Sequence, residues 1–154
     1  RILICIGRFS DVESASSCYR ILGDEVRLRL LRLLSRERLN VSELTAVLGI
    51  AQSGVSRHLK LLKGAGFIDE QRSGGFTYHS ITDLATQGRG TLWANLRDQF
   101  DQAADDPAVK ADEARLQEVM RLRKESFAAQ SDDDRTNRQF VPGRSWAAWS
   151  NPAR

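Results

Sequence analysis

The apolar residues of this chain change their spacing partway along the sequence, and this change restricts the folds available to it. As far as Gly64 and Gly66 they recur at the three-to-four-residue interval of amphipathic helices. The next two runs, FIDEQRS and FTYHSI, are rich in aromatic and β-branched residues and are separated by Gly74-Gly75, which predicts a β-hairpin. The pattern therefore predicts a mostly α-helical fold with a small β-hairpin.

The helical part divides at recognisable start and stop residues. Residues 14–50 predict three helices, of which the second has Asp24 as a plausible N-cap. Asn40 or Ser42 begins the third, and Gly49 ends it. A fourth helix follows within GIAQSGVSRHLKLLKGAGFID, where three apolar residues lie on one face: Val55, Leu59 and Leu62.

The fourth helix lies in a segment without carboxylates. Between Glu43 and Asp69 there is no acidic residue, but the segment contains three cations, Arg57, Lys60 and Lys63. Phosphate backbones repel carboxylates and attract cations. A helix, a glycine turn, a helix and a hairpin in this order predict a winged helix-turn-helix whose fourth helix enters DNA.

The outward positions of this helix carry short polar and cationic side chains, which can reach base edges or phosphates from a major groove. Arg72, beside the hairpin tip, is placed to reach a neighbouring minor groove or phosphate. For His58 a surface histidine without a DNA contact is an equal alternative, and His79 is expected to be structural. The predicted contacts with double-stranded DNA are Ser42, Gln52, Ser53, Ser56, Arg57, His58, Lys60 and Arg72.

Composition narrows the class of protein further. Cys5 and Cys18 are too few for a disulfide framework or a zinc site, which favours a reducing cytoplasm. For Cys18 a buried, inert thiol is favoured over a redox pair with Cys5. The longest purely apolar run, residues 2–6, is far short of a membrane span, so we expect no membrane partner. The sequence has no nucleophile–base pair, metal-ligand cluster or phosphate loop, so it predicts no enzyme, cofactor or metal site.

Charge separates the chain into two parts. Residues 16–82 hold ten Lys or Arg against six acidic residues, and residues 83–134 hold seven against twelve, which predicts separate roles. The acidic part contains a predicted helix over 91–100 and another that begins at Asp106-Pro107. Their apolar stripe either belongs to the core of the single chain or is buried across a dimer. Because the stripe exceeds what a small winged-helix core covers, we favour C-terminal dimerisation helices, with an interface formed by Leu92, Trp93, Leu96, Phe100, Leu116 and Met120.

The segments ILGDEVRLRLLRLLS, VSELT and SRHLKLLKGAGFI, followed by the glycine-tipped hairpin, resemble the DNA-binding domain of the ArsR family of bacterial repressors. The resemblance implies a homodimer on a partly palindromic operator, released by an effector that the sequence leaves unidentified. Thr45, Ala46 and Val47 stand where many metal-sensing members carry cysteine, and residues 83–154 contain no histidine. Ala51 stands where the family often has a capping serine.

A second resemblance concerns the C-terminal part. LQEVMRLRKESFAAQ and FVPGRSWAAW resemble the connector of ArsR-type regulators fused to an S-adenosylmethionine-dependent methyltransferase. The alternative function is therefore the regulatory part of such a fusion, without its catalytic domain. The expected organisation is a disordered or non-native arm over 1–14, the winged-helix and dimerisation domain over 15–104, a long amphipathic helix over 105–131, and a flexible linker to a missing domain over 132–154.

Overall fold

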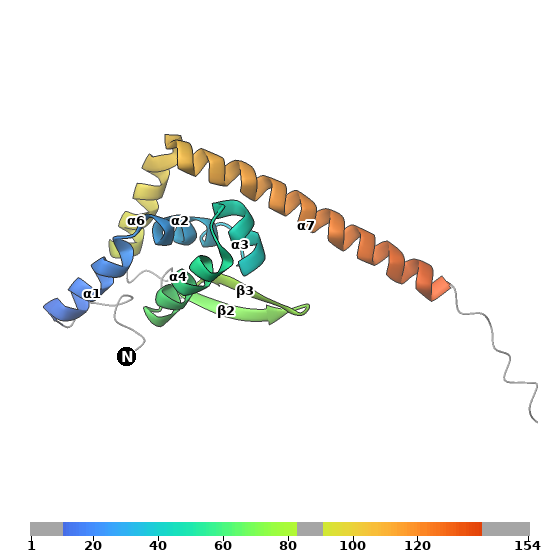
Figure 1. Ribbon diagram of the computed structural model, residues 1–154, viewed down its shortest axis with the longest axis horizontal. Helices are drawn as coiled ribbons and strands as arrows, with labels where there is room; N and C mark the ends of the chain where they lie inside the picture. The colour runs from blue at the N-terminus through green and yellow to red at the C-terminus, as the bar shows by residue number, and fades with distance from the viewer. Residues whose placement is uncertain (1–10, 83–90, 140–154) are drawn as a thin grey trace, which may run out of the picture. The chain divides into compact units, whose positions relative to one another are not determined.

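The computed structural model describes residues 11–82 and 91–139 (Figure 1). The chain divides into two compact units after Val119, so the last helix contributes to both. In chain order the elements are α1 Val12–Leu22, α2 Glu25–Leu34, β1 Leu39–Asn40, α3 Val41–Leu48, α4 Gln52–Gly64, β2 Ile68–Ser73, β3 Phe76–Ile81, α6 Thr91–Gln102, the 3₁₀ turn η1 Ala103–Asp105, and α7 Pro107–Gln139.

The helix boundaries follow local capping chemistry. The Asp24 carboxylate accepts a first-turn backbone N–H of α2 at 3.0 Å, which confirms the predicted cap. Asn40, rather than Ser42, caps α3, and Glu43 completes a reciprocal capping box. Gly49 ends α3 in the left-handed conformation, with φ 68°, where glycine carries no Cβ penalty.

The helix α1 begins inside the span predicted as an N-terminal arm, residues 1–14. Asp11 caps α1, because its carboxylate accepts the backbone N–H of Ser14 at 2.7 Å, and the helix therefore begins at Val12. The apolar pattern alone gave no signal for this start, since the cap precedes the first buried residue of the helix, Cys18. Residues 1–10, including Cys5, lie outside the described residues.

The predicted hairpin is confirmed and forms part of a three-stranded antiparallel sheet in the order β1-β3-β2. Gly74 and Gly75 both adopt positive φ, as the two-residue turn between Ser73 and Phe76 requires. The sequence did not indicate β1, which pairs Leu39 with His79. A strand of two residues is too short to show an alternating pattern.

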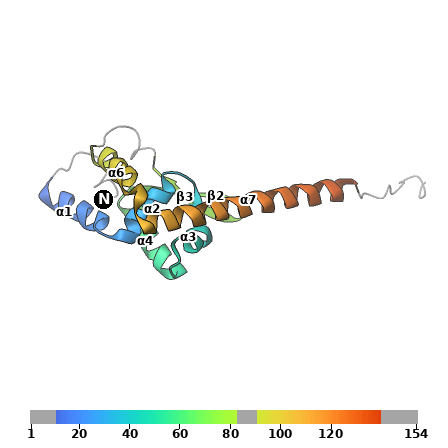
Figure 2. The ribbon, with the colours of Figure 1, turned by 90° about the horizontal axis from the view of Figure 1, so that it is seen from above.

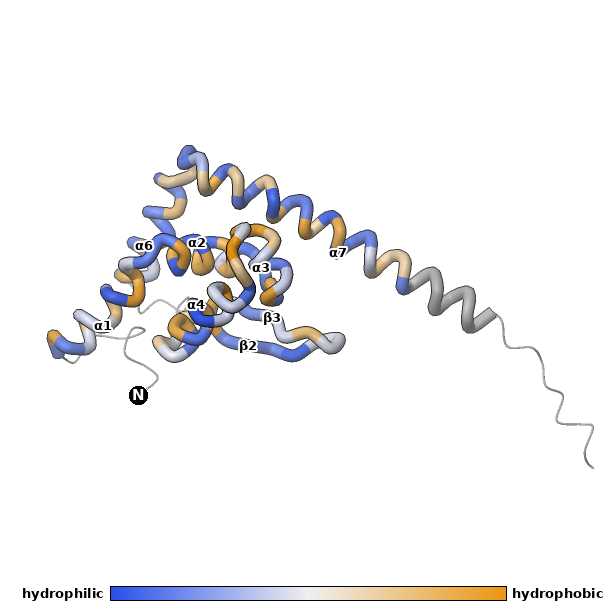
Figure 3. The backbone as a smooth tube through the Cα atoms, in the orientation of Figure 1, coloured by the Kyte–Doolittle hydropathy of each residue, from blue (hydrophilic) through white to orange (hydrophobic). Residues whose placement is uncertain are grey.

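The core lies where the first four helices meet the base of the sheet. Buried leucine and valine side chains of α2, α3 and α4 supply most of it. Phe67 between α4 and β2, Trp93 of α6 and Leu116 of α7 add to it. Figure 3 shows the contrasting hydrophilic character of β2, whose residues are exposed after Ile68. The predicted inward face of α4 is confirmed, because three of its residues are buried: Val55, Leu59 and Leu62.

Ion pairs attach the first turns of α7 to the helix-turn-helix. The guanidinium of Arg29 donates to both carboxylate oxygens of Asp112 at 2.7 and 2.6 Å, and Asp112 is only 2% exposed. This hydrogen bond, together with the Asp112 charge, raises the pKa of Arg29. Arg115 donates to the carbonyl oxygen of Val47 in α3 at 2.9 Å. Seen from above in Figure 2, these turns cross over α2.

The second unit begins at Met120 and contains the rest of α7. Arg121 pairs with Glu125 one turn later, while Leu122 and Phe127 are 49% and 57% exposed. The helix α7 continues over residues 132–139, the start of the span predicted as a flexible linker, because extending an established helix costs little. Over the described residues, every helix is too short or too polar to cross a bilayer.

Candidate nucleic-acid interface

The outer face of α4 is a polar, cationic surface. Gln52, Ser53, Ser56, Arg57 and Lys60 are all exposed, as the helical pattern predicted. They are held in place because the opposite face of the same helix is buried in the core. The first turn of α4 contains no acidic residue. We call this surface the α4 outer face. It can approach a phosphate backbone without repulsion from its own side chains.

The start of α4 leaves backbone donors uncapped. Ala51 occupies the N-cap position and makes no side-chain hydrogen bond to the first turn. The N–H groups of a first helical turn have no intrahelical acceptor. They point along the helix axis toward any anion beside the N-terminus, where the helix dipole also favours negative charge. Ala51 therefore leaves the first N–H groups of α4 without a side-chain acceptor, which suits a phosphate.

The hairpin provides a second exposed surface, which we call the wing. Arg72 is exposed on β2 and lies opposite Thr77 near the tip, as predicted. Phe76 is 55% exposed beside the Gly-Gly turn, and its ring lies edge-on to Tyr78 with centroids 6.4 Å apart. Phe76 was not among the predicted DNA contacts. An exposed phenylalanine next to a two-glycine turn was the available signal.

One acidic residue at the base of the wing is neutralised by its neighbours. Glu70 accepts a hydrogen bond from Lys63 Nζ at 2.5 Å, and its other oxygen lies 3.4 Å from Nε2 of the buried His79. The hydrogen bond from Lys63 is the main cause of the lowered pKa of Glu70. Lys63 is therefore engaged with Glu70 at the base of the wing, unlike Arg57 and Lys60. The structural assignment of His79 agrees with its burial.

The structure separates His58 from the other predicted contacts. Its ring is half-buried, with Nδ1 3.5 Å from an Arg27 nitrogen and 3.9 Å from an Asp24 oxygen. His58 therefore contacts the start of α2, and its DNA-contact assignment is the weaker of the two alternatives. Ser42 is exposed in the first turn of α3.

The predicted dimerisation stripe is partly covered within the single chain. Trp93 is 8% exposed and Leu116 is 2% exposed, so both are largely covered within the single chain, and their place in a dimer interface stays a prediction. Leu92, Leu96 and Phe100 are half-buried and keep surface for a partner. Met120 belongs to the second unit and is also half-buried.

Cys18 is fully buried, as the sequence analysis favoured. A redox pair with Cys5 stays untested, because Cys5 is not among the described residues. Within the described ranges, 11–82 and 91–139, no three His, Cys, Asp or Glu side chains are grouped as metal ligands.

This chain is similar in sequence to known bacterial regulatory proteins. The sequence profile of the family described as "Bacterial regulatory protein, arsR family" matches residues 24–70. The arsenic resistance transcriptional regulator ArsR1 of Pseudomonas putida is 33% identical over 76 residues, which cover 49% of this chain and 59% of that protein. The arsenical resistance operon repressor of Bacillus subtilis is 31% identical over 71 residues, which cover 46% of this chain and 68% of the repressor.

Among solved structures, the transcriptional repressor BigR from Xylella fastidiosa is similar, with a TM-score of 0.50 and 25% identity. The similarity covers 61% of this chain and 89% of BigR. The chain spans less than two thirds of the length of the Pseudomonas protein. The resemblance of residues 91–149 to a methyltransferase-fusion connector stays a prediction, and residues 140–149 lie outside the described part.

Proposed function

Because this chain belongs to the ArsR family of bacterial regulatory proteins, we propose that it represses transcription by binding a specific DNA operator. The observation that carries this proposal is the α4 outer face. It is exposed and free of acidic residues, and it is fixed by a buried inner face. These are the properties that a recognition helix needs to enter the major groove.

The residues of this surface divide into two roles. Gln52, Ser53, Ser56 and Arg57 lie on the first half of α4 and read base edges. Lys60 and Arg72 are exposed cations on α4 and the wing, and they bind phosphates. The phosphate contacts set the position of the protein on the duplex, and the base contacts supply specificity.

The proposal includes a homodimer. Leu92, Leu96 and Phe100 of α6 keep apolar surface that the single chain does not cover, and on α1 Val12 and Tyr19 are largely exposed. A two-fold dimer would present two recognition helices to half-sites about one helical turn apart, which requires a partly palindromic operator. Such a regulator acts in the bacterial cytoplasm, where the chromosome lies.

The test is fluorescence anisotropy of the full chain with DNA from upstream of its own gene and with scrambled DNA of the same length. We expect a preference of ~10³ or more for the upstream DNA at physiological salt. Between about 50 and 200 mM salt, both affinities should fall, because phosphate contacts release counterions. Equal affinity for the two DNAs at every salt concentration would contradict a specific repressor.

A further inference from the structure

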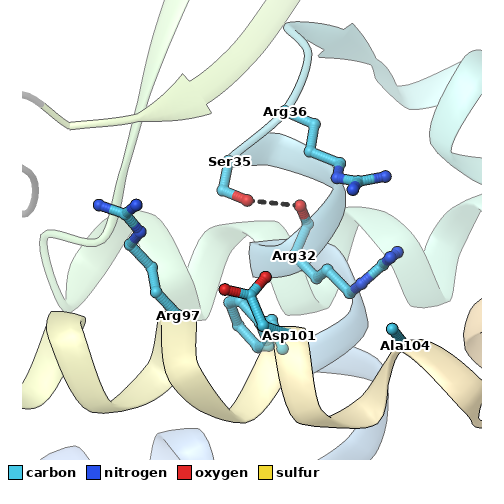
Figure 4. A pocket seen from close by; sticks show the side chains of 7 residues that line it. Arg32, Ser35, Arg36, Arg97, Asp101 and Ala104 are labelled. Atoms are coloured by element: carbon cyan, nitrogen blue, oxygen red, sulfur yellow. Dashed lines mark hydrogen bonds between the residues drawn. The ribbon is translucent and has the colours of Figure 1, made fainter.

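A cavity lies between α2 and α6, apart from the α4 outer face and the wing (Figure 4). Its volume is about 300 Å³, which is the lower end of the range for small-molecule sites. Both helices that form it belong to the first compact unit. The residues that line it are Arg32, Ser35, Arg36, Arg97, Phe100, Asp101 and Ala104.

The walls of the cavity carry an excess of positive charge. The lining residues include three arginines, Arg32, Arg36 and Arg97, and a single carboxylate, that of Asp101. Glu113 of α7 lies behind two of these arginines, pairing with Arg36 and lying 3.4 Å from Arg32 Nη2. The three guanidinium groups carry three positive charges, and the carboxylates of Asp101 and Glu113 carry two negative charges, so one positive charge is in excess. The described residues provide no ion pair for Arg97.

Arg32 is incompletely satisfied where it stands. The residue is only 8% exposed, and within the described part of the chain its Nη1 is buried without a hydrogen-bond acceptor. A buried donor without an acceptor is costly. The described residues provide no acceptor for Nη1, and an anion bound beside this guanidinium would place negative charge next to it.

The remaining walls define the rest of the ligand. Figure 4 shows the Asp101 carboxylate between the Arg97 side chain and the Arg32 side chain. Phe100 of α6 and Ala104 of η1 supply apolar surface, and the Phe100 ring is held edge-on to Trp93 with centroids 6.4 Å apart. The Ser35 hydroxyl already donates to the Arg32 carbonyl oxygen at 2.6 Å, so its oxygen remains free to accept.

We propose that this cavity binds a small organic anion. A carboxylate of the ligand accepts hydrogen bonds from the arginines that line the cavity, and a hydroxyl or amino group of the ligand next to it donates to Asp101. A short apolar or aromatic body packs on Phe100. The guanidinium fork suits a carboxylate because it offers two parallel N–H donors, and the volume limits the ligand to about the size of one substituted ring.

The position of the cavity gives the ligand a route to the recognition helix. α2 forms one wall, and Arg27 at its start contacts His58 of α4. A ligand that bridges α2 and α6 would fix α6, which carries predicted dimer contacts, relative to α2, which contacts α4. This regulatory consequence rests on the proposed repressor function, whereas binding of the anion does not.

The first experiment uses 2-hydroxybenzoate as the probe, with its neutral amide as the matched compound, on the full 154-residue chain without DNA. We expect calorimetry to give saturable binding of the benzoate with a dissociation constant below about 1 mM, which is reasonable for a ligand of this size. The amide should not bind measurably, because it lacks the charge. In amide NMR spectra, the largest shifts should fall on Phe100 and Ala104.

Arg97→Gln is the test variant, because Arg97 is exposed and its replacement leaves the core intact. It should weaken benzoate binding by ~10-fold or more, since it removes a charge-assisted hydrogen bond. Arg121→Gln, at another exposed arginine, on α7, should bind as the unmodified chain does. Absence of saturable benzoate binding, equal binding of the amide, or equal loss in both variants would overturn the proposed site.

A second measurement separates this proposal from the repressor function. DNA anisotropy is repeated with and without saturating 2-hydroxybenzoate. If the benzoate binds and changes operator affinity, both proposals are supported. If the benzoate binds but the chain prefers no DNA, only the repressor function fails. If the chain binds its operator but not the benzoate, only the anion site fails.

Discussion

Individual basic residues of this chain have different roles, and their surroundings determine which. Arg57 and Lys60 are exposed on α4, whereas Arg29 is engaged with a buried carboxylate and Lys63 with a surface one. A count of positive charge treats all four alike. Only the exposed ones are available to a phosphate or a base, so substitutions at the two kinds of site should change different measurements.

Arg57→Ala should weaken binding to the operator by about 1–3 kcal/mol and relax specificity at one base position. The reason is that Arg57 is exposed on the half of α4 proposed to read bases. Anisotropy with operator and scrambled DNA measures the change, and Lys110→Ala, an exposed cation of α7, serves as the control. An equal loss on both DNAs would assign Arg57 to a phosphate instead.

Asp112→Ala should lower the free energy of unfolding by about 3 kcal/mol, because it leaves the Arg29 guanidinium partly buried without its partner. Urea denaturation followed by circular dichroism measures this loss. Glu125→Ala, which breaks the exposed Arg121 pair, should change stability by no more than about 0.5 kcal/mol. Equal effects of the two variants would mean that the buried pair contributes no more than a surface pair.

Glu70→Gln should destabilise the protein slightly at pH 7 and less at pH 3. The pKa of Glu70 is lowered in the folded state, mainly by Lys63. Its contribution to stability is therefore present above the unfolded pKa and is lost as the pH falls through the folded one. Because Glu70 is 36% exposed, we expect less than about 1 kcal/mol.

Urea midpoints of Glu70→Gln and the unmodified chain at the two pH values would measure this difference. His79 lies on the other side of the Glu70 carboxylate and is present in both proteins. A Glu70→Gln effect that grows as the pH falls from 7 to 3 would contradict the sign derived from the lowered pKa.

Among the helices, α4 begins without a capping side chain, whereas α1, α2 and α3 each begin with Asp or Asn. Ala51→Ser should therefore raise the free energy of unfolding by about 1 kcal/mol, because the serine hydroxyl would accept a first-turn N–H. Ala114→Ser, at an exposed position within α7, should instead lower it by about 0.5 kcal/mol. Thermal denaturation of both variants measures the two changes in stability. Stabilisation by Ala114→Ser would contradict a capping mechanism.

For the molecule as a whole, the core is completed before the second unit begins. Leu116 is the last buried residue among those described, and the first unit ends at Val119. A fragment of residues 1–119 should therefore unfold within about 4 °C of the full chain, because no large buried apolar contact is removed. Calorimetry on both chains measures this. A fall of more than about 10 °C would show that residues after Val119 stabilise the winged fold.

Most helix boundaries could be predicted because they depend on neighbouring residues. Asp24 and Gly49 act through hydrogen bonds and φ values within one turn, and Gly74-Gly75 defines the hairpin in the same way. The start of α1 and the strand β1 were missed. Asp11 caps a helix whose first turns are largely exposed, and β1 exists only because β3 pairs with it.

The sequence by itself determined the order of the helices and the hairpin, the inward and outward faces of α4, and the exposed polar residues that form the candidate interface. Periodicity and charge are local properties, so they can be read without knowing how helices pack. The tertiary structure decided which charged side chains form ion pairs and which stay exposed. Arg29 meets Asp112 across 83 residues, and α2 and α6 bring Arg32 and Arg97 to one cavity. Such contacts depend on how distant segments pack, and no local pattern encodes them.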